Sequence, residues 1–302
     1  QHRLDQFHRV LAGPVGVADH AAHFAAVAVV EDRGGQAESA ERPGRFHARY
    51  LALLGATHHA TLMALNTPLT MNAQEIEPGL FIRGLTPPLR LADFKLVAFD
   101  MDSTLINIEC IDELADFAGR KAEVSAITEA AMRGELDYRE SLKKRVAILE
   151  GLNAQVLARV FSERLLLNPG ARELLEALQA ANIHTALLSG GFTYFTERLR
   201  IELGLDFATS NELEIVSGKL TGKVVGEIVD AQAKADMLLS LSNEFGLTQD
   251  QVMAVGDGAN DLLMMAAAGT SIAYHAKPAT QAKATHAINH GGLDSILSLY
   301  PA

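Results

Sequence analysis

The chain has 302 residues and 48% apolar content, so it can bury one large domain and a smaller one. Its formal net charge of −11 argues against a nucleic-acid-binding surface, because such surfaces gather Lys and Arg against phosphates. The single cysteine, Cys110, excludes an internal disulfide framework and any zinc site built on several thiolates.

Residues 1–90 differ in composition from the rest of the chain. They contain eight Arg, no Lys and eight acidic residues and are therefore neutral, whereas residues 91–302 carry the whole negative excess. The turn-rich segment 83–88, which includes Pro87 and Pro88, marks the expected linker. We expect a small N-terminal α+β accessory domain at 1–90, with a regulatory role left open, and a catalytic domain at 91–302.

Within the first 90 residues the pattern predicts a strand at 24–30, a helix at 46–54 and a strand at 61–65. The run at 24–30 is far shorter than the roughly 20 apolar residues that cross a bilayer, and no secretory signal precedes it. We therefore expect a cytoplasmic protein with no membrane span and no nucleic-acid partner. Association into a homodimer stays open.

From residue 94 onward, strands and helices are predicted to alternate. Short buried strands are expected at 95–99, 184–188 and 252–255, a hairpin at 212–228, and helices at 171–181, 194–203, 231–245 and 262–268. Such alternation is typical of an α/β domain with a parallel sheet. Residues 107–165 interrupt it with a helical stretch, which we interpret as a cap inserted after the first strand.

The strongest local signal follows the first buried strand, where Asp100 and Asp102 are separated by one residue. A calcium loop starting at Asp100 would require Gly at its sixth position and Glu at its twelfth, but these are Leu105 and Ile111. The two acids therefore fit better at the carboxyl end of a strand, where open α/β sheets bind their ligands.

A second acidic loop follows the strand at 252–255 and contains Asp257, Asn260 and Asp261. Carboxylates from two neighbouring strands could hold Mg²⁺, which prefers oxygen ligands. Between the two loops lie Ser189-Gly190, whose hydroxyl and backbone N–H suit phosphate oxygens, and Lys234, which adds a positive charge. Each feature is weak alone, and their order along the chain makes the pattern specific.

These four motifs, in this order, resemble those of the haloacid dehalogenase superfamily, and the resemblance extends from about residue 94 to the C-terminus. It implies a Rossmann-like α/β domain with a helical cap. It also implies that Asp100 is a nucleophile that becomes phosphorylated and that Asp102 is the acid and base. The roles implied for the remaining residues are Mg²⁺ binding by Asp100, the Asp102 carbonyl and Asp257, with Asp261 behind them, and phosphoryl binding by Ser189, Gly190, Lys234 and Asn260.

The cap segments 106–115 and 131–146 resemble those of phosphoserine phosphatases, a family within the superfamily. This likeness implies hydrolysis of O-phosphoserine, the last step of serine biosynthesis, with Glu109 holding the ammonium and Arg145 the carboxylate of the substrate. Tyr138 departs from the phenylalanine expected there. Cys110 is expected only to pack, because a cysteine-based phosphatase needs Arg six residues later, where this chain has Asp116.

Two alternatives stay open at this point. The chemistry could act on another small phosphomonoester, or transfer the phosphoryl group between hydroxyls, because one fold hosts many specificities. The domain could instead be a vestigial, non-catalytic binding protein, although the intact acids argue against this.

Overall fold

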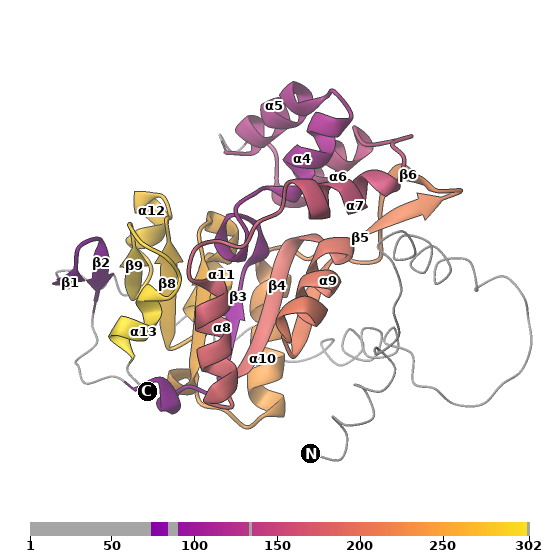
Figure 1. Cartoon of the computed structure of the whole chain (residues 1–302). Coiled ribbons are helices and arrows are strands. Elements are labelled where there is room, and N and C mark those ends of the chain that lie inside the picture. The colour runs from indigo at the N-terminus through magenta and orange to yellow at the C-terminus, as the bar shows by residue number, and fades with distance from the viewer. Residues whose placement is uncertain (1–73, 84–89, 133–134, 301–302) are drawn as a thin grey trace, which may run out of the picture. The chain divides into compact units, whose positions relative to one another are not determined.

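A computed structural model describes residues 74–83, 90–132 and 135–300 (Figure 1). The strands and helix expected between residues 24 and 65, and with them the α+β accessory domain, lie outside the described residues. Within the described ranges, no helix combines the length and the apolar character needed to cross a membrane.

A single sheet of nine strands organises the described part of the chain. Its spatial order is β1-β2-β9-β8-β7-β3-β4-β5-β6. The six strands from β9 to β5 are parallel, and both ends of the sheet are completed by antiparallel pairs. The strand bounds are β1 Gln74–Glu77, β2 Leu80–Ile82, β3 Leu96–Phe99, β4 His184–Phe192, β5 Phe207–Val216, β6 Lys219–Val225, β7 Val252–Gly256, β8 Thr270–Tyr274 and β9 His286–Ile288.

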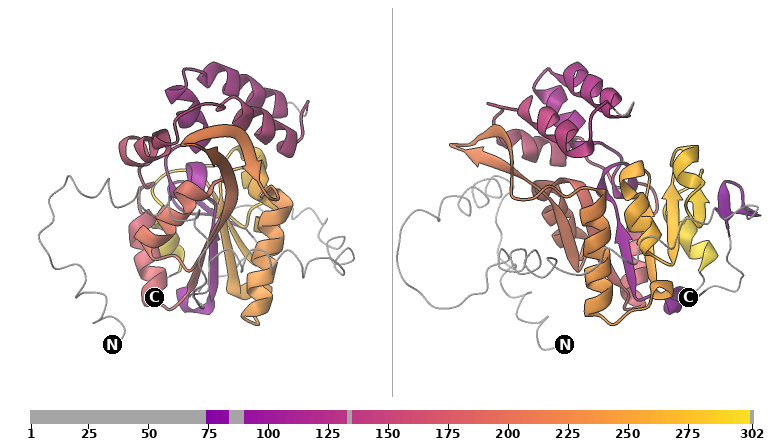
Figure 2. Two further views of the ribbon diagram at one scale, coloured as in Figure 1. Left: turned by 90° about the vertical axis from the view of Figure 1, so that its right-hand side faces the viewer. Right: turned by 180° about the vertical axis from the view of Figure 1, so that it is seen from behind.

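Helices cover both faces of the sheet, because successive strand residues point to opposite sides. On β3, Val97 and Phe99 join one buried cluster while Leu96 and Ala98 join the other. The first cluster is completed by α8 (Ala171–Ala180), α9 (Thr193–Leu203) and α13 (Ser295–Leu299), and the second by α10 (Ala231–Glu244) and α11 (Leu262–Ala267). Figure 2 shows this layering, with α10 on the side opposite to α8 and α9.

Four of the helices between β3 and β4 form the expected cap above the carboxyl ends of the strands (Figure 1). They are α4 (Cys110–Phe117), α5 (Lys121–Met132), α6 (Tyr138–Ala147) and α7 (Gln155–Glu163). The two stems of the insertion are tied together by an antiparallel bridge between Ile106 and Leu167. The Asn168 side-chain amide also donates to the carbonyl oxygens of Thr104 and Ile106, at 2.8 and 3.1 Å.

The sheet extends further toward the N-terminus than the sequence pattern predicted. Strands β1 and β2 form a hairpin before the linker expected at 83–88, and β2 pairs antiparallel with β9 through Leu80 opposite Ile288 and Ile82 opposite His286. Residues 74–82 therefore pack with the α/β domain, although they precede the boundary expected at residue 90. The hairpin is placed by pairing with a strand some 200 residues later, which local patterning does not report.

Candidate active site

The candidate site lies where three adjacent parallel strands end. Phe99 of β3 is in register with Leu187 of β4 and with Val255 of β7. Asp100, Ser189 and Asp257 follow these positions by one or two residues and so reach the same edge of the sheet. Because parallel strands share one carboxyl edge, three segments far apart in sequence bring their polar residues together here.

The turn after β3 carries Asp102 back toward the cap. Ser103 adopts the left-handed conformation, with φ 57° and ψ 0°, and its backbone N–H donates to the Ile108 carbonyl at 3.2 Å. The Ser103 hydroxyl donates to Glu109 at 2.7 Å, while the Cys110 backbone N–H donates to Asp102 Oδ1 at 3.3 Å. Asp102, the expected acid and base, and Glu109, the expected ammonium-binding residue, are therefore linked by one closed turn.

Lys234 of α10 joins the first acidic loop to the second. Its ammonium donates to Asp100 Oδ1 at 2.6 Å and to Asp261 Oδ1 at 2.8 Å. All three side chains are buried, with Lys234 only 1% exposed. A buried ammonium between two carboxylates satisfies charges that would otherwise be costly to keep from water.

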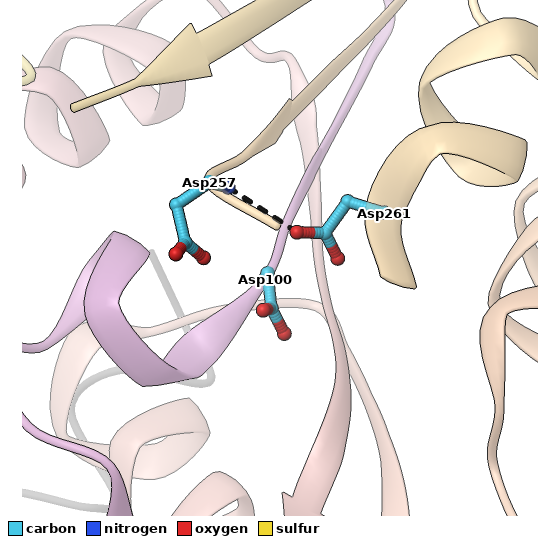
Figure 3. A group of neighbouring side chains, drawn as sticks. All are labelled: Asp100, Asp257 and Asp261. Atoms are coloured by element: carbon cyan, nitrogen blue, oxygen red, sulfur yellow. Dashed lines mark hydrogen bonds between the residues drawn. The ribbon is translucent and has the colours of Figure 1, made fainter. Parts of the chain in front are cut away.

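Asp261 also fixes the backbone of the loop that follows β7. Its Oδ2 accepts from the backbone N–H group of Asp257 at 3.2 Å (Figure 3) and from that of Gly258 at 3.0 Å. A Cβ atom on Gly256 would lie 2.6 Å from the Asp261 side chain, so glycine is required for this approach. Asn260 contributes a longer contact, from its amide nitrogen to Asp261 Oδ1 at 3.4 Å.

Asp100, Asp257 and Asp261 offer oxygens that all lie within 4.8 Å of one another (Figure 3). Burial and the charge of Asp261 raise the pKa of Asp100 to about 8, an effect that the Lys234 ammonium opposes. Burial and Asp261 likewise raise the pKa of Asp257 to about 7. The pKa of Asp102 also lies well above its usual range, because the group is buried beside Glu109 and Asp100. The cluster thus holds more negative charge than Lys234 neutralises.

The segment after Leu188 closes the site from the side of β4. The Ser189 hydroxyl oxygen accepts from the Gly191 backbone N–H at 2.9 Å. The Gly190 carbonyl accepts from the Asn211 amide at 2.8 Å and from the Tyr138 hydroxyl at 3.2 Å. A Cβ atom on Gly191 would lie 3.1 Å from Asp102 Oδ2, so this backbone passes directly against the second acid.

The two cap residues predicted to bind substrate lie near these acids, Glu109 at an exposed position and Arg145 half-buried. Desolvation of its carboxyl raises the pKa of Glu109 and outweighs the opposing effects of the Ser103 hydroxyl and of the Arg145 and Lys234 charges. Arg145 Nε is buried without a hydrogen-bond partner among the described residues. A buried guanidinium nitrogen left unpaired is a ready donor for an incoming anion.

Three residues to which the sequence pattern assigns no role also support the site. Thr104 donates to Asp257 Oδ1 at 3.2 Å, and Asn211 accepts from the Val229 backbone N–H at 2.8 Å while donating to Gly190. Arg139 of the cap donates to Asp230 of the core at 2.6 Å. Each contact spans 18 or more residues of sequence, so local patterning carries no signal for it.

A sizeable cavity lies elsewhere in the described part of the chain. It has a volume of about 710 Å³ and is lined at the amino ends of β3, β7 and β8 by residues such as Lys95, Gln251 and Thr270. Ligands of parallel α/β sheets bind at the opposite, carboxyl edge. The cluster of acids under the cap is therefore the better candidate for the chemistry.

Comparison with known proteins agrees with this geometry. Residues 94–269 match the family described as haloacid dehalogenase-like hydrolase. A protein of Polaromonas sp. named phosphoserine phosphatase is 56% identical over 234 residues, which cover 76% of this chain and 99% of the relative. The chain belongs to the haloacid dehalogenase-like hydrolases and, within them, to the phosphoserine phosphatase family.

Two solved structures share the fold. The unliganded structure of a probable phosphoserine phosphatase from Vibrio cholerae is 50% identical, with a TM-score of 0.63, and the match covers 70% of this chain and 65% of that one. A structure titled as a phospho-aspartyl intermediate analogue of phosphoserine phosphatase is 40% identical, with a TM-score of 0.65 and coverage of 68% and 99%. The fold expected from the sequence, an α/β domain with an inserted helical cap, is confirmed.

Proposed function

We propose that this chain hydrolyses O-phosphoserine to serine and inorganic phosphate through a phosphorylated Asp100. The observation that carries the proposal is that Asp100, hydrogen-bonded to Lys234, lies beneath a cap that presents the Glu109 carboxylate and the buried, unpaired Nε of Arg145. The name of the Polaromonas relative and the phospho-aspartyl title of the related structure support the same reaction.

In the first step, an Asp100 carboxylate oxygen attacks phosphorus, and the bond from phosphorus to the serine oxygen breaks. Lys234, at 2.6 Å from Asp100, favours the charged form of this nucleophile. Burial and the Glu109 and Asp100 charges raise the pKa of Asp102 and so favour its protonated form, which can donate a proton to the departing alkoxide. Ser189, Gly190, Lys234 and Asn260 bind the phosphoryl oxygens.

In the second step, the same groups act in reverse. The Asp102 carboxylate accepts a proton from water as the water oxygen attacks phosphorus. The bond between phosphorus and Asp100 then breaks, releasing phosphate and restoring the Asp100 carboxylate. Both proton transfers pass through Asp102, whose carboxylate lies at the Gly191 backbone and thus within the phosphoryl-binding segment.

The acids fit a bound Mg²⁺ ion. The cluster presents hard oxygen donors, and its raised pKa values reflect carboxylate charge that Lys234 alone does not offset. Asp100, Asp257 and the Asp102 carbonyl would hold the ion, which when bound supplies charge neutralisation between the nucleophile and the phosphate. Asp261 would support them from behind, because its oxygens already accept from Lys234 and from two backbone N–H groups.

The cap supplies the specificity. Phosphoserine presents an ammonium and a carboxylate besides its phosphate, and a pocket for it needs one acid and one base that binds carboxylate in a fork. Glu109 would hold the ammonium, and the unpaired Nε of Arg145 would donate to the carboxylate. Generic phosphomonoesters lack both groups and gain nothing from these two residues.

The test is a phosphatase screen on phosphorylated amino acids, sugars and an aryl phosphate, with and without Mg²⁺, on wild type and Arg145→Ala. Loss of a charged hydrogen bond predicts a rise of about 10- to 100-fold in KM for phosphoserine. The KM for the aryl phosphate should stay within about twofold. Arg120→Ala is the control, because Arg120 is an exposed cap residue paired with Glu123. Equal effects on both substrates would refute the amino-acid pocket.

A further inference from the structure

The first two residues of α6 cross from the cap to two different segments of the core. The Tyr138 hydroxyl donates to the Gly190 carbonyl at 3.2 Å, and Arg139 Nε donates to Asp230 Oδ2 at 2.6 Å. Burial raises the pKa of Tyr138 to about 12, so the phenol keeps its proton and stays a donor at neutral pH. Two neighbouring side chains thus dock one end of this helix.

Both core segments take part in the candidate site. Gly190 follows Ser189 at the end of β4, and Asp230 is the N-cap of α10, where it accepts from the Ala233 backbone N–H at 3.0 Å. Lys234 lies in the first turns of that same helix. The docked end of α6 therefore touches the phosphoryl-binding turn and the helix that carries the buried lysine.

The helix α6 also carries Arg145. Tyr138 and Arg145 are seven residues apart, which is about two helical turns, so they lie on the same face of the helix. The Arg145 charge acts on both Glu109 and Tyr138. The contacts of the first turn of α6 with the core consequently determine the position of the Arg145 side chain relative to the acidic cluster of the site.

We propose that Tyr138 and Arg139 are positioning residues that form a latch, holding the cap closed so that Arg145 is aligned over the Gly190 turn and the Lys234 helix. The role of the latch in aligning Arg145 rests on the proposed function, whereas the latch itself is defined by its two contacts between cap and core. Neither residue is assigned a part in the chemistry.

The Tyr138 contact can be removed without leaving a defect in the core. Gly190 keeps a second donor, the Asn211 amide at 2.8 Å, so Tyr138→Phe leaves no buried carbonyl unpaired. A Cβ atom on Gly190 would lie 2.1 Å from the Tyr138 oxygen, so the phenol reaches the backbone only because residue 190 is glycine. The loss of the hydroxyl should therefore act on cap opening more than on global stability.

Cys110 provides a readout that does not depend on activity. It is the only cysteine in the chain, it is fully buried at the start of the cap helix α4, and its thiol interacts with the Asp102 carboxylate. Alkylation by iodoacetamide under native conditions therefore requires the site to open. Tyr138→Phe and Arg139→Gln should each raise the alkylation rate about two- to tenfold, as expected for one lost hydrogen bond. In the double variant the two factors should multiply, because both contacts oppose the same opening.

The control is Arg159→Gln, since Arg159 is exposed to nearly the same degree as Arg139, 55% against 54%, but pairs with Glu163 inside the cap. Its alkylation rate should match wild type. Affinity for inorganic phosphate, measured by calorimetry with Mg²⁺, should stay within about twofold in all variants, because the latch does not touch phosphate and stabilises the closed state with or without it.

Unchanged alkylation in both latch variants, or an equal rise in Arg159→Gln, would overturn the proposal. A rise accompanied by a matching loss of phosphate affinity would also overturn it, because the residues would then act on binding and not on closure. Absence of phosphoserine turnover would refute the proposed function alone, since alkylation reports cap opening in either case.

Discussion

Replacing Lys234 by methionine tests the electrostatic core of the site. The lysine is 1% exposed and lies 2.6 Å from Asp100 and 2.8 Å from Asp261, two carboxylates that are themselves no more than 5% exposed. Methionine preserves much of the volume but leaves both acids without their cation. Removing one partner of a buried ion pair typically costs about 3–5 kcal/mol, so we expect the free energy of unfolding at pH 7 to fall by that amount.

The assay is urea unfolding followed by circular dichroism, together with thermal melts. For a domain of this size, each kcal/mol corresponds to about 2–4 °C, which predicts a fall in Tm of roughly 6–20 °C. Lys223→Met is the matched control, because Lys223 is exposed on β6, and its Tm should change by no more than about 2 °C. A loss of less than about 1 kcal/mol in Lys234→Met would show that the acids do not depend on this ammonium.

Two further predictions concern pH and metal. Burial lowers the pKa of His286 from 6.5 to about 4. As the pH falls, the unfolded chain therefore binds a proton at this residue before the folded chain does. The free energy of unfolding should thus decrease by about 3 kcal/mol between pH 6.5 and pH 4. His286→Gln, compared with wild type in unfolding titrations from pH 7 to 4, should flatten this part of the slope, and an unchanged slope would contradict the assignment. Mg²⁺ at 100 times its dissociation constant should stabilise wild type by about 2.7 kcal/mol. In thermal melts with and without Mg²⁺, Asp257→Asn should lose most of this stabilisation. If Mg²⁺ stabilises the variant as much as wild type, the ion binds elsewhere.

The central strands and the cap could be predicted from the sequence because their signals are local. The buried runs at 95–99 and 252–255 each end in an acid, and they became β3 and β7 with Asp100 and Asp257 at their carboxyl ends. A helical insertion was expected at 107–165, and the structure has four helices between 110 and 163. These features depend on side-chain periodicity within short windows.

Other parts of the fold were missed because they depend on pairing between distant segments. Strand β9 has only three residues, and the β1–β2 hairpin gains its place by pairing with it. Thr104 was not singled out, because its bond to Asp257 exists only when β3 and β7 lie in register across 153 residues. Tyr138 departs from the phenylalanine expected at its position, but its bond to Gly190 crosses 52 residues between cap and core, so the local pattern does not predict the contact.

The negative net charge of the chain means that the site needs local positive charge to bind an anionic substrate. A protein with a charge of −11 repels an anionic substrate at long range, so attraction must come from a few local cations. Among the described residues near the acids these are Lys234 and Arg145, and Lys234 is already engaged by two carboxylates. Arg145 lies in the cap, where it can bind the substrate carboxylate. It does not neutralise the carboxylates that surround the phosphate. A divalent cation on Asp100 and Asp257 would supply the missing positive charge. Kinetics should therefore separate the two effects. Removal of the metal should slow hydrolysis of every phosphomonoester, whereas loss of Arg145 should affect only substrates that carry a carboxylate.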